Sequence, residues 1–197
     1  PDAETQLRVA DFLDRETQHT DALIEANRRV MALLVARREV WLSDRLRRLM
    51  IREEDWVRLK FLASRITVGI VIEPSRWYVE AGGVPALRGL NVSPGKVSPE
   101  DVVQITHEGN RANPKSRLKS GDVVVVRTGK AGSASVVPEW AVGGNCIDLL
   151  LVSPGARLLP DFLATFLNSH EASRQVREGT SGAIQGHFNV EALQDVR

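Results

Sequence analysis

A long stretch without glycine or proline is the feature that most constrains this chain. From Glu4 to about Met50 the sequence contains neither residue, and Asp2 and Glu4 supply acidic groups where a helix N-terminus favours them. We expect one continuous helix, which at about 1.5 Å per residue would be roughly 70 Å long. Such a helix cannot bury its apolar side chains against itself. It needs a second helix from the same chain, from another copy or from another protein.

One face of this expected helix follows the three–four spacing of a coiled coil. Thr17, Thr20 and Asn27 are polar positions in this seam, which fits partner selection better than a sealed core. Nothing later in the chain supplies an equally long helix, so we expect pairing between chains. The alternative is a break near residues 39–42 that folds the helix back as a hairpin. The residues that we expect to pair are Leu13, Ile24, Asn27, Met31, Leu34 and Trp41.

The rest of the chain predicts a mixed, β-rich globular domain with peripheral helices. The fold class is therefore α+β, with a long coiled-coil-type helix over residues 1–50 and a globular domain over residues 51–197. Residues 107–116 are rich in Gly, Asn, Pro and Arg and predict a loop, and Asn189 predicts a helix cap. Strands are expected at 67–72, 78–79, 84–87, 102–106, 123–126, 134–137 and 149–152, and helices at 160–167 and 171–178.

Residues 118–137 form the centre of this domain in our interpretation. Four valines, Val123 to Val126, follow a Gly-Asp turn signal, and short β-branched runs of this kind indicate a buried strand. The polar, basic segment 127–133 separates it from a second strand that stops at Pro138. A hairpin with a basic, hydroxyl-bearing loop suits an anionic, grooved partner, because cations meet phosphates and polar tips reach base edges. The alternative is an ordinary surface hairpin.

Two sharper interpretations of this loop fail on spacing. Gly129-Lys130 lacks the upstream glycine of a phosphate-binding loop, and Ala131 stands where that motif needs a hydroxyl residue. Gly129-x-x-Gly132 is not a dinucleotide fingerprint, because no helical pattern follows it.

Composition sets wider limits. A net charge of +1 argues against indiscriminate nucleic-acid binding but permits a local basic patch. The lone cysteine, Cys146, implies no disulfide framework, and neither a membrane-spanning segment nor a secretion signal is visible, so we expect a cytoplasmic protein. The first residue is Pro1, which suggests a fragment or a processed product. The basic residues that cluster in one segment are Arg111, Lys115, Arg117, Lys119, Arg127 and Lys130.

Several motifs, in this order, resemble the DNA specificity subunit of type I restriction–modification enzymes. They are E-T-Q-x-x-V-A-D-F-L-D (4–14), G-G-V-P (82–85) with R-G-L-N-V (88–92), L-K-S-G-D-V-V-V-V-R-T-G-x-x-G (118–132), P-x-F-L-x-x-F-L-N-S (160–169) and G-x-x-Q-x-H-F-N (182–189). Each motif alone is weak, but together they extend over nearly the whole chain.

This resemblance implies a target-recognition domain attached to one spacer helix. Family members usually carry two such domains and two helices, so that each domain reads half of a split DNA sequence and the helices set the gap. This chain looks like half of such a subunit, either a fragment or a half-length form. The family's specificity subunit is not catalytic and belongs to a defence against foreign DNA. Its partners are a methyltransferase subunit, which uses S-adenosylmethionine, and a restriction–translocase subunit, which uses ATP and magnesium.

Under this interpretation, Arg111, Lys115, Arg117 and Lys130 contact phosphates and make binding salt-dependent. Arg127 or Arg88 would read guanine, and Gln185 or Asn91 would read adenine, because these side chains form paired hydrogen bonds with base edges. Arg127 has an alternative, an ion pair with Asp122 or Glu139. The remaining candidates are Thr128 and Ser133 in the first loop, and Thr180, Ser181, Gln185 and His187 in a second candidate loop at 180–187.

An enzyme has little support in the sequence. No N-P-P-[FY] or D-P-P-[FY] methyltransferase motif is present, and the four histidines show no ligand-like pairing with Cys146, so we expect no metal site and no cofactor bound by this chain. The alternative from another class is a docking protein that works through its long helix and has no independent DNA affinity. A second copy of the chain, or a second half-subunit, would then pair with that helix.

Overall fold

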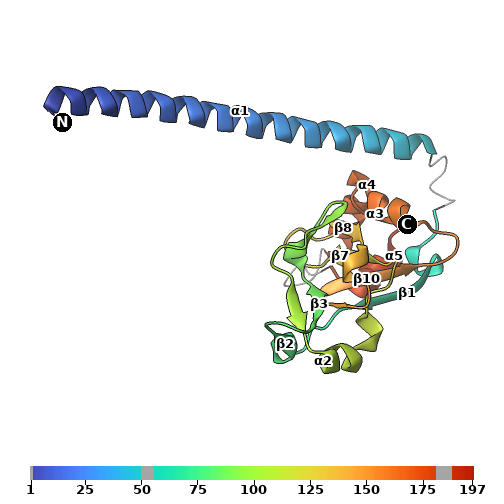
Figure 1. Ribbon diagram of the computed structural model, residues 1–197. Helices are drawn as coiled ribbons and strands as arrows, with labels where there is room; N and C mark the ends of the chain where they lie inside the picture. Colours follow the sequence, from blue (N-terminus) through green and yellow to red (C-terminus); the bar gives the residue numbers. More distant parts are fainter. Residues whose placement is uncertain (1, 50–55, 181–187) are drawn as a thin grey trace. The chain divides into compact units, whose positions relative to one another are not determined.

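The computed structural model describes residues 2–49, 56–180 and 188–197. The chain divides into two compact units, residues 1–49 and residues 50–197 (Figure 1). The first unit is a single helix, α1, over Ala3–Leu49. It passes without interruption through residues 39–42, so the continuous helix predicted from the sequence is confirmed and the helical hairpin is wrong.

The start of α1 is capped by Asp2. The backbone N–H of Thr5 donates to Asp2 Oδ1 at 2.8 Å, which satisfies one of the unpaired donors of the first turn. Hydrogen bonds from Thr5 hold the pKa of Asp2 below its usual value. Ion pairs one turn apart add support on the surface, with 2.6 Å between Glu25 Oε1 and Arg28 Nη1.

Apolar side chains along α1 are exposed, including most of the predicted seam. Leu13, Ile24, Met31 and Leu34 are between 43% and 63% exposed. The apolar residues are not confined to that seam, because Leu7, Val9, Phe12, Leu23 and Leu33 are exposed as well.

The globular unit is built around a four-stranded antiparallel sheet with the order β1-β10-β7-β8. Its strands are β1 (Ala63–Val68), β10 (Leu149–Pro154), β7 (Val123–Val126) and β8 (Ala134–Val136). All four valines of β7 are buried, which places this strand at the centre of the domain. The β-branched run therefore forms a strand covered on both faces, as predicted.

A second four-stranded sheet has the order β2-β6-β3-β9. It consists of β2 (Tyr78–Val79), β6 (Val103–Ile105), β3 (Val84–Leu87) and β9 (Asn145–Cys146). The pairs of this sheet are antiparallel except for β3 with β9, which is parallel. A small hairpin joins β4 (Val92–Ser93) to β5 (Lys96–Val97).

The hydrophobic core lies where the two sheets meet. Val124 and Val126 of β7 and Leu149 and Leu151 of β10 pack in one buried cluster with Leu87 of β3. Because strand side chains alternate between faces, the other face of β7 is left for the helices. These are α3 (Pro160–Leu167), α4 (His170–Thr180) and α5 (Val190–Asp195); α3 packs on β7 and β8, and α5 packs on β1 (Figure 1).

The main local correction concerns residues 107–116, which the sequence predicted as a loop. Residues His107–Ala112 form helix α2, and Pro114–Ser116 form a 3-10 turn. Thr106 caps the helix, since its Oγ1 accepts from the N–H of Gly109 at 3.0 Å. Gly109 is required there, because a Cβ atom would lie 2.7 Å from the ring of Trp77. The cap and the close packing outweigh the low helix propensity of this sequence.

Candidate nucleic-acid interface

The hairpin of β7 and β8 holds loop 127–133 on a buried base. Val125 pairs with Ala134 in the last register of the ladder. Beyond it, the N–H of Gly132 donates to Val126 O at 2.9 Å, and the N–H of Ser133 donates to Lys130 O at 3.1 Å. The loop therefore has a hydrogen-bonded internal structure, and the predicted hairpin is confirmed.

The tip of this loop points into open space. Gly129 has a φ of 77° and no atom lies within 4 Å of its ideal Cβ position. Thr128 and Lys130 on either side of it are exposed. Gly132, with a φ of 89°, is instead buried, and its ideal Cβ would lie 3.4 Å from Val176 of α4. One side of the loop is thus supported by a helix, and its polar tip is accessible.

Asn168, just after α3, fixes the outer edge of the hairpin. Its Oδ1 accepts from the N–H of Ala134 at 2.9 Å, and its Nδ2 donates to Ala134 O at 2.8 Å. This amide takes the place of a neighbouring strand at the residue where loop 127–133 re-enters β8. Asn168 lies within a motif noted in the sequence, but its role could not be inferred there, because the contact joins segments far apart in the chain.

Arg127 is held by the protein itself. Its Nη1 forms an ion pair with Asp148 Oδ1 at 2.6 Å, and its side chain is 19% exposed. Its Nε also donates to the carbonyl of Phe188 at 3.3 Å. The partners suggested by the sequence, Asp122 and Glu139, are wrong, because Asp148 takes that place.

The segment 88–97 borders the same end of β7. A Cβ atom on Gly89 would lie 3.7 Å from Val126, and the N–H of Gly95 donates to Ala134 O at 3.0 Å. Asn91 is 1% exposed, its Oδ1 accepts from the N–H of Arg88, and its Nδ2 donates to the carbonyl of Glu100 at 2.8 Å. Its amide is therefore occupied, and we assign Asn91 to the support of this turn rather than to adenine reading.

Arg88 is half-buried and donates to the carbonyl of Asp101 at 2.8 Å. Lys96, at the start of β5, is exposed and was not among the residues predicted from the sequence. The turn Ser93-Pro94-Gly95-Lys96 was the only signal for it. We call the surface formed by Arg88, Lys96 and residues 127–133 the hairpin-loop face.

The second predicted loop, residues 180–187, lies almost entirely outside the described residues. Ser181, Gln185 and His187 lie outside the described residues, and the side chain of Thr180 is not described either. The flanking residues are informative, because Val176 lies against Gly132 and Phe188 is bonded to Arg127. The two described residues that flank it, Val176 and Phe188, therefore both adjoin loop 127–133.

The other predicted cations lie at the opposite end of β7. Lys115, Arg117 and Lys119 precede this strand, whereas Arg127 and Lys130 follow it. Four residues of strand, at about 3.3 Å each, separate the two groups by roughly 13 Å. The basic residues predicted as one cluster thus form two separate groups, because a strand through the core divides them.

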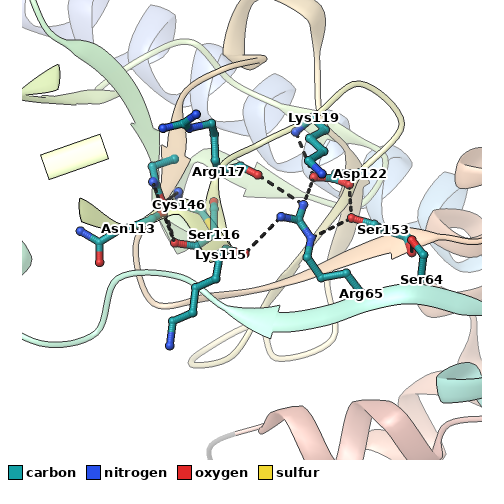
Figure 2. Close-up of polar contacts among 11 residues, drawn as sticks. Ser64, Arg65, Asn113, Lys115, Ser116, Arg117, Lys119, Asp122, Cys146 and Ser153 are labelled. Carbon is teal, nitrogen blue, oxygen red and sulfur yellow. Dashed lines mark hydrogen bonds and ion pairs between the residues drawn. The ribbon is translucent and has the colours of Figure 1, made fainter. Parts of the chain in front are cut away.

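Arg65 organises the backbone of the basic segment, which we define as residues 111–119. Its guanidinium donates to the carbonyls of Lys115 and Arg117, at 3.1 and 3.3 Å, and to Asp122 Oδ2 at 2.6 Å (Figure 2). Asp122 is 2% exposed, and it also accepts from the N–H of Lys119 at 2.9 Å and from the hydroxyl of Ser153. The ion pair between Arg65 and Asp122 therefore fixes the backbone of Lys119, the last cation before β7.

A buried amide chain holds the same segment from the other side. Ser116 Oγ donates to Asn145 Oδ1 at 2.8 Å, and Asn145 Nδ2 donates to Asn110 Oδ1 at 2.9 Å. Lys115 and Arg111 project from this fixed backbone and are exposed, and Arg117 is half-buried. Figure 2 shows the side chains of Lys115 and Arg117 leaving the segment in opposite directions.

Metal and redox chemistry find little support among the described side chains. Within residues 2–49, 56–180 and 188–197, no group of three His, Cys, Asp or Glu residues could hold a metal ion. Cys146 is buried, and burial raises the pKa of its thiol to about 12. No helix in the described part of the chain is long and apolar enough to cross a membrane.

Comparisons with known proteins support the fold. No protein-family model and no curated protein matches the sequence. A chain from a structure of the type I R-M system, described for its complex assembly and conformational transition, matches with a TM-score of 0.60 and 20% identity, over 100% of this chain and 47% of that one. The HsdS subunit from Thermoanaerobacter tengcongensis matches with a TM-score of 0.58 and 20% identity, over 89% of this chain and 43% of that one. The chain therefore has the fold of type I specificity subunits, as the resemblance predicted, and spans less than half the length of these two structures.

Proposed function

We propose that this chain reads one half of a split DNA sequence, as part of the specificity subunit of a type I restriction–modification complex. The observation that carries this proposal is the hairpin-loop face, where the exposed tip at Thr128–Lys130 stands on a base that is buried and hydrogen-bonded. A rigid base is needed because base edges are discriminated by the position of donors and acceptors. The shared fold with type I specificity subunits supports the same conclusion.

The proposed contacts divide by chemistry. On the hairpin-loop face, Thr128, Ser133 and Lys130 are the candidates for base edges and neighbouring phosphates, together with Arg88 and Lys96. Gln185, His187, Ser181 and Thr180 remain predictions beside them. The basic segment supplies Arg111, Lys115 and Lys119 as phosphate contacts, which orient a domain without reading sequence.

The long helix would serve assembly. Its exposed apolar residues match the requirement for a second helix, from another copy of the chain or from a second half-subunit. We propose that a methyltransferase subunit and a restriction–translocase subunit are the partners. In that arrangement this chain is not catalytic, and S-adenosylmethionine, ATP and magnesium are used by the partner subunits in the cytoplasm.

The test is selection from a randomised duplex pool at two salt concentrations, with and without a cognate methyltransferase subunit. We expect enrichment of a short motif of a few base pairs. Lys115→Ala and Lys119→Ala should weaken binding uniformly and lower the salt slope by about one unit each, because each removes one phosphate contact. Lys60→Ala, which removes a cation outside both basic groups, is the matched control. Binding without enrichment would leave only a basic surface.

The docking alternative makes a different prediction. If the chain acts only through α1, then Lys115→Ala and Lys119→Ala change nothing, and assembly fails when the seam becomes charged. Ile24→Glu and Leu34→Glu, followed by sedimentation analysis with the methyltransferase subunit, measure that loss. Both proposals expect these helix variants to disrupt pairing, so the DNA selection decides between them.

A further inference from the structure

We propose that Arg127 is a positioning residue that clamps the base of loop 127–133, rather than a reader of guanine. The proposal rests on the DNA-reading function above and refines it. On the hairpin-loop face it assigns base discrimination to the loop tip at Thr128–Lys130. Arg127 and Asp148 together hold that loop in place through their ion pair.

The first part of the clamp is a two-point attachment to Phe188. The carbonyl of Arg127 accepts from the N–H of Phe188 at 3.1 Å, and its Nε donates to the carbonyl of the same residue at 3.3 Å. Phe188 is 0% exposed, so it is a fixed anchor. One residue at the end of β7 is thereby bonded to the segment that leads into α5.

The second part is the ion pair with Asp148. This residue lies between β9 and β10 and has a φ of 49°, in the left-handed region. Its N–H donates to the carbonyl of Ile70 at 3.1 Å, which fixes its backbone, while its Oδ1 meets Arg127 Nη1 at 2.6 Å. Arg127 therefore joins the hairpin, the β9–β10 connection and Phe188 at one point.

This use of the guanidinium conflicts with guanine reading. A guanine contact needs two parallel N–H groups from one edge of the guanidinium. The Nε–H of one edge is used by Phe188, and Nη1 of the other edge is already paired with Asp148. The side chain is also only 19% exposed. Thr128 and Lys130, one and three residues further on, have no such burial.

The experiment compares Arg127→Ala, Asp148→Asn and the double variant in the full chain. Asp148→Asn removes the charge, and asparagine tolerates a positive φ, so this variant keeps the proposal testable even if Arg127→Ala does not fold. Base preferences are measured at each position of the selected half-site, together with the salt slope and the urea midpoint. Hydrogen exchange of the Phe188 amide is followed in the free chain, without DNA.

The clamp predicts one shared phenotype. Both single variants lose preference at several base positions together, by about ten- to a hundredfold, as expected for lost charge-assisted hydrogen bonds. The double variant adds little to Arg127→Ala, because that change already removes the ion pair that Asp148→Asn weakens. The salt slope stays unchanged, and the Phe188 amide exchanges faster.

Two results would overturn the proposal, and they are distinguishable. If Arg127→Ala relaxes a single base position while Asp148→Asn keeps the wild-type profile, then Arg127 reads that base directly. If the unmodified chain selects no motif with the methyltransferase subunit present, the DNA-reading function itself fails, and the role of the clamp in discrimination fails with it.

Discussion

The buried pair of Arg65 and Asp122 gives the most quantitative prediction for stability. Asp122→Ala removes a carboxylate whose side chain is 3% exposed, and with it the acceptor for Arg65, for the N–H of Lys119 and for the hydroxyl of Ser153. Breaking a buried ion pair by removing one partner costs about 3–5 kcal/mol. Unfolding free energies of whole domains are only about 5–15 kcal/mol, so the effect is large.

The structure places the expected value at the lower end of this range. Arg65 keeps the carbonyls of Lys115 and Arg117 as acceptors, and its side chain is 21% exposed. The charge of Arg65 therefore keeps part of its stabilisation, and we expect Asp122→Ala to lower the free energy of unfolding by about 3 kcal/mol. For a chain of this size that corresponds to a decrease in Tm of roughly 6–12 °C.

The assay is urea unfolding followed by circular dichroism. With an m-value of about 2 kcal/mol per molar urea, the midpoint decreases by about 1.5 M at unchanged m. Asp195→Asn is the matched control, because it removes a carboxylate whose partners Lys60 and Arg58 are at the surface; a far smaller shift is expected there.

A double-mutant cycle tests the cause. Arg65→Met combined with Asp122→Ala should cost clearly less than the sum of the two single changes, because each single variant leaves a charge without its partner and the double variant leaves none. The reasoning is refuted if the two costs add, or if Asp122→Ala shifts the midpoint no more than Asp195→Asn.

Three further outcomes are expected. Gly69→Ala should destabilise the domain, because its Cβ would lie 2.4 Å from the carbonyl of Cys146, whereas Gly89→Ala meets no atom closer than 3.7 Å; urea midpoints of the two variants compare them. The thiol of Cys146, with its pKa raised to about 12 by burial, should not react with a thiol reagent at pH 8 until urea unfolds the chain. The same shift contributes stability that is complete below the unfolded thiol pKa of about 8.5 and is lost as the pH rises towards 12. Asn168→Ala should speed hydrogen exchange at the Ala134 amide, which loses its acceptor.

The elements that sequence predicted well are those specified by neighbouring residues. The absence of glycine and proline predicted α1, the valine run predicted β7, and Asn189 predicted a cap, which the structure places at 2.8 Å from the N–H of Ala192. Helix α3 begins and ends at the predicted residues, Pro160 and Leu167. In each case the signal and the structure lie within a few residues of one another, so tertiary context was not needed.

The arrangement of the candidate site depended on contacts between distant segments. The sequence alone does not tell whether the amide of Asn91 faces solvent or supports a turn. The positions of Arg88 and Glu100, which bond to it, show that it supports a turn. Arg127 finds Asp148 because β7 and β10 are neighbours in the sheet, with Val126 opposite Leu149. Counting cations along the chain likewise could not show that β7 separates the basic segment from Lys130.

The pairing of β1 with β10 has a consequence for synthesis in the cell. Val68 pairs with Leu150, so the strand of the main sheet that is made first needs one that is made last. At about 5–20 residues per second, β1 leaves the ribosome on the order of ten seconds before β10 is available. During this interval α1 and β1 are both outside the ribosome with apolar residues uncovered. A helix that paired with α1 while the chain is still growing would cover the first of these segments, whereas β1 stays without its partner strand until β10 is made.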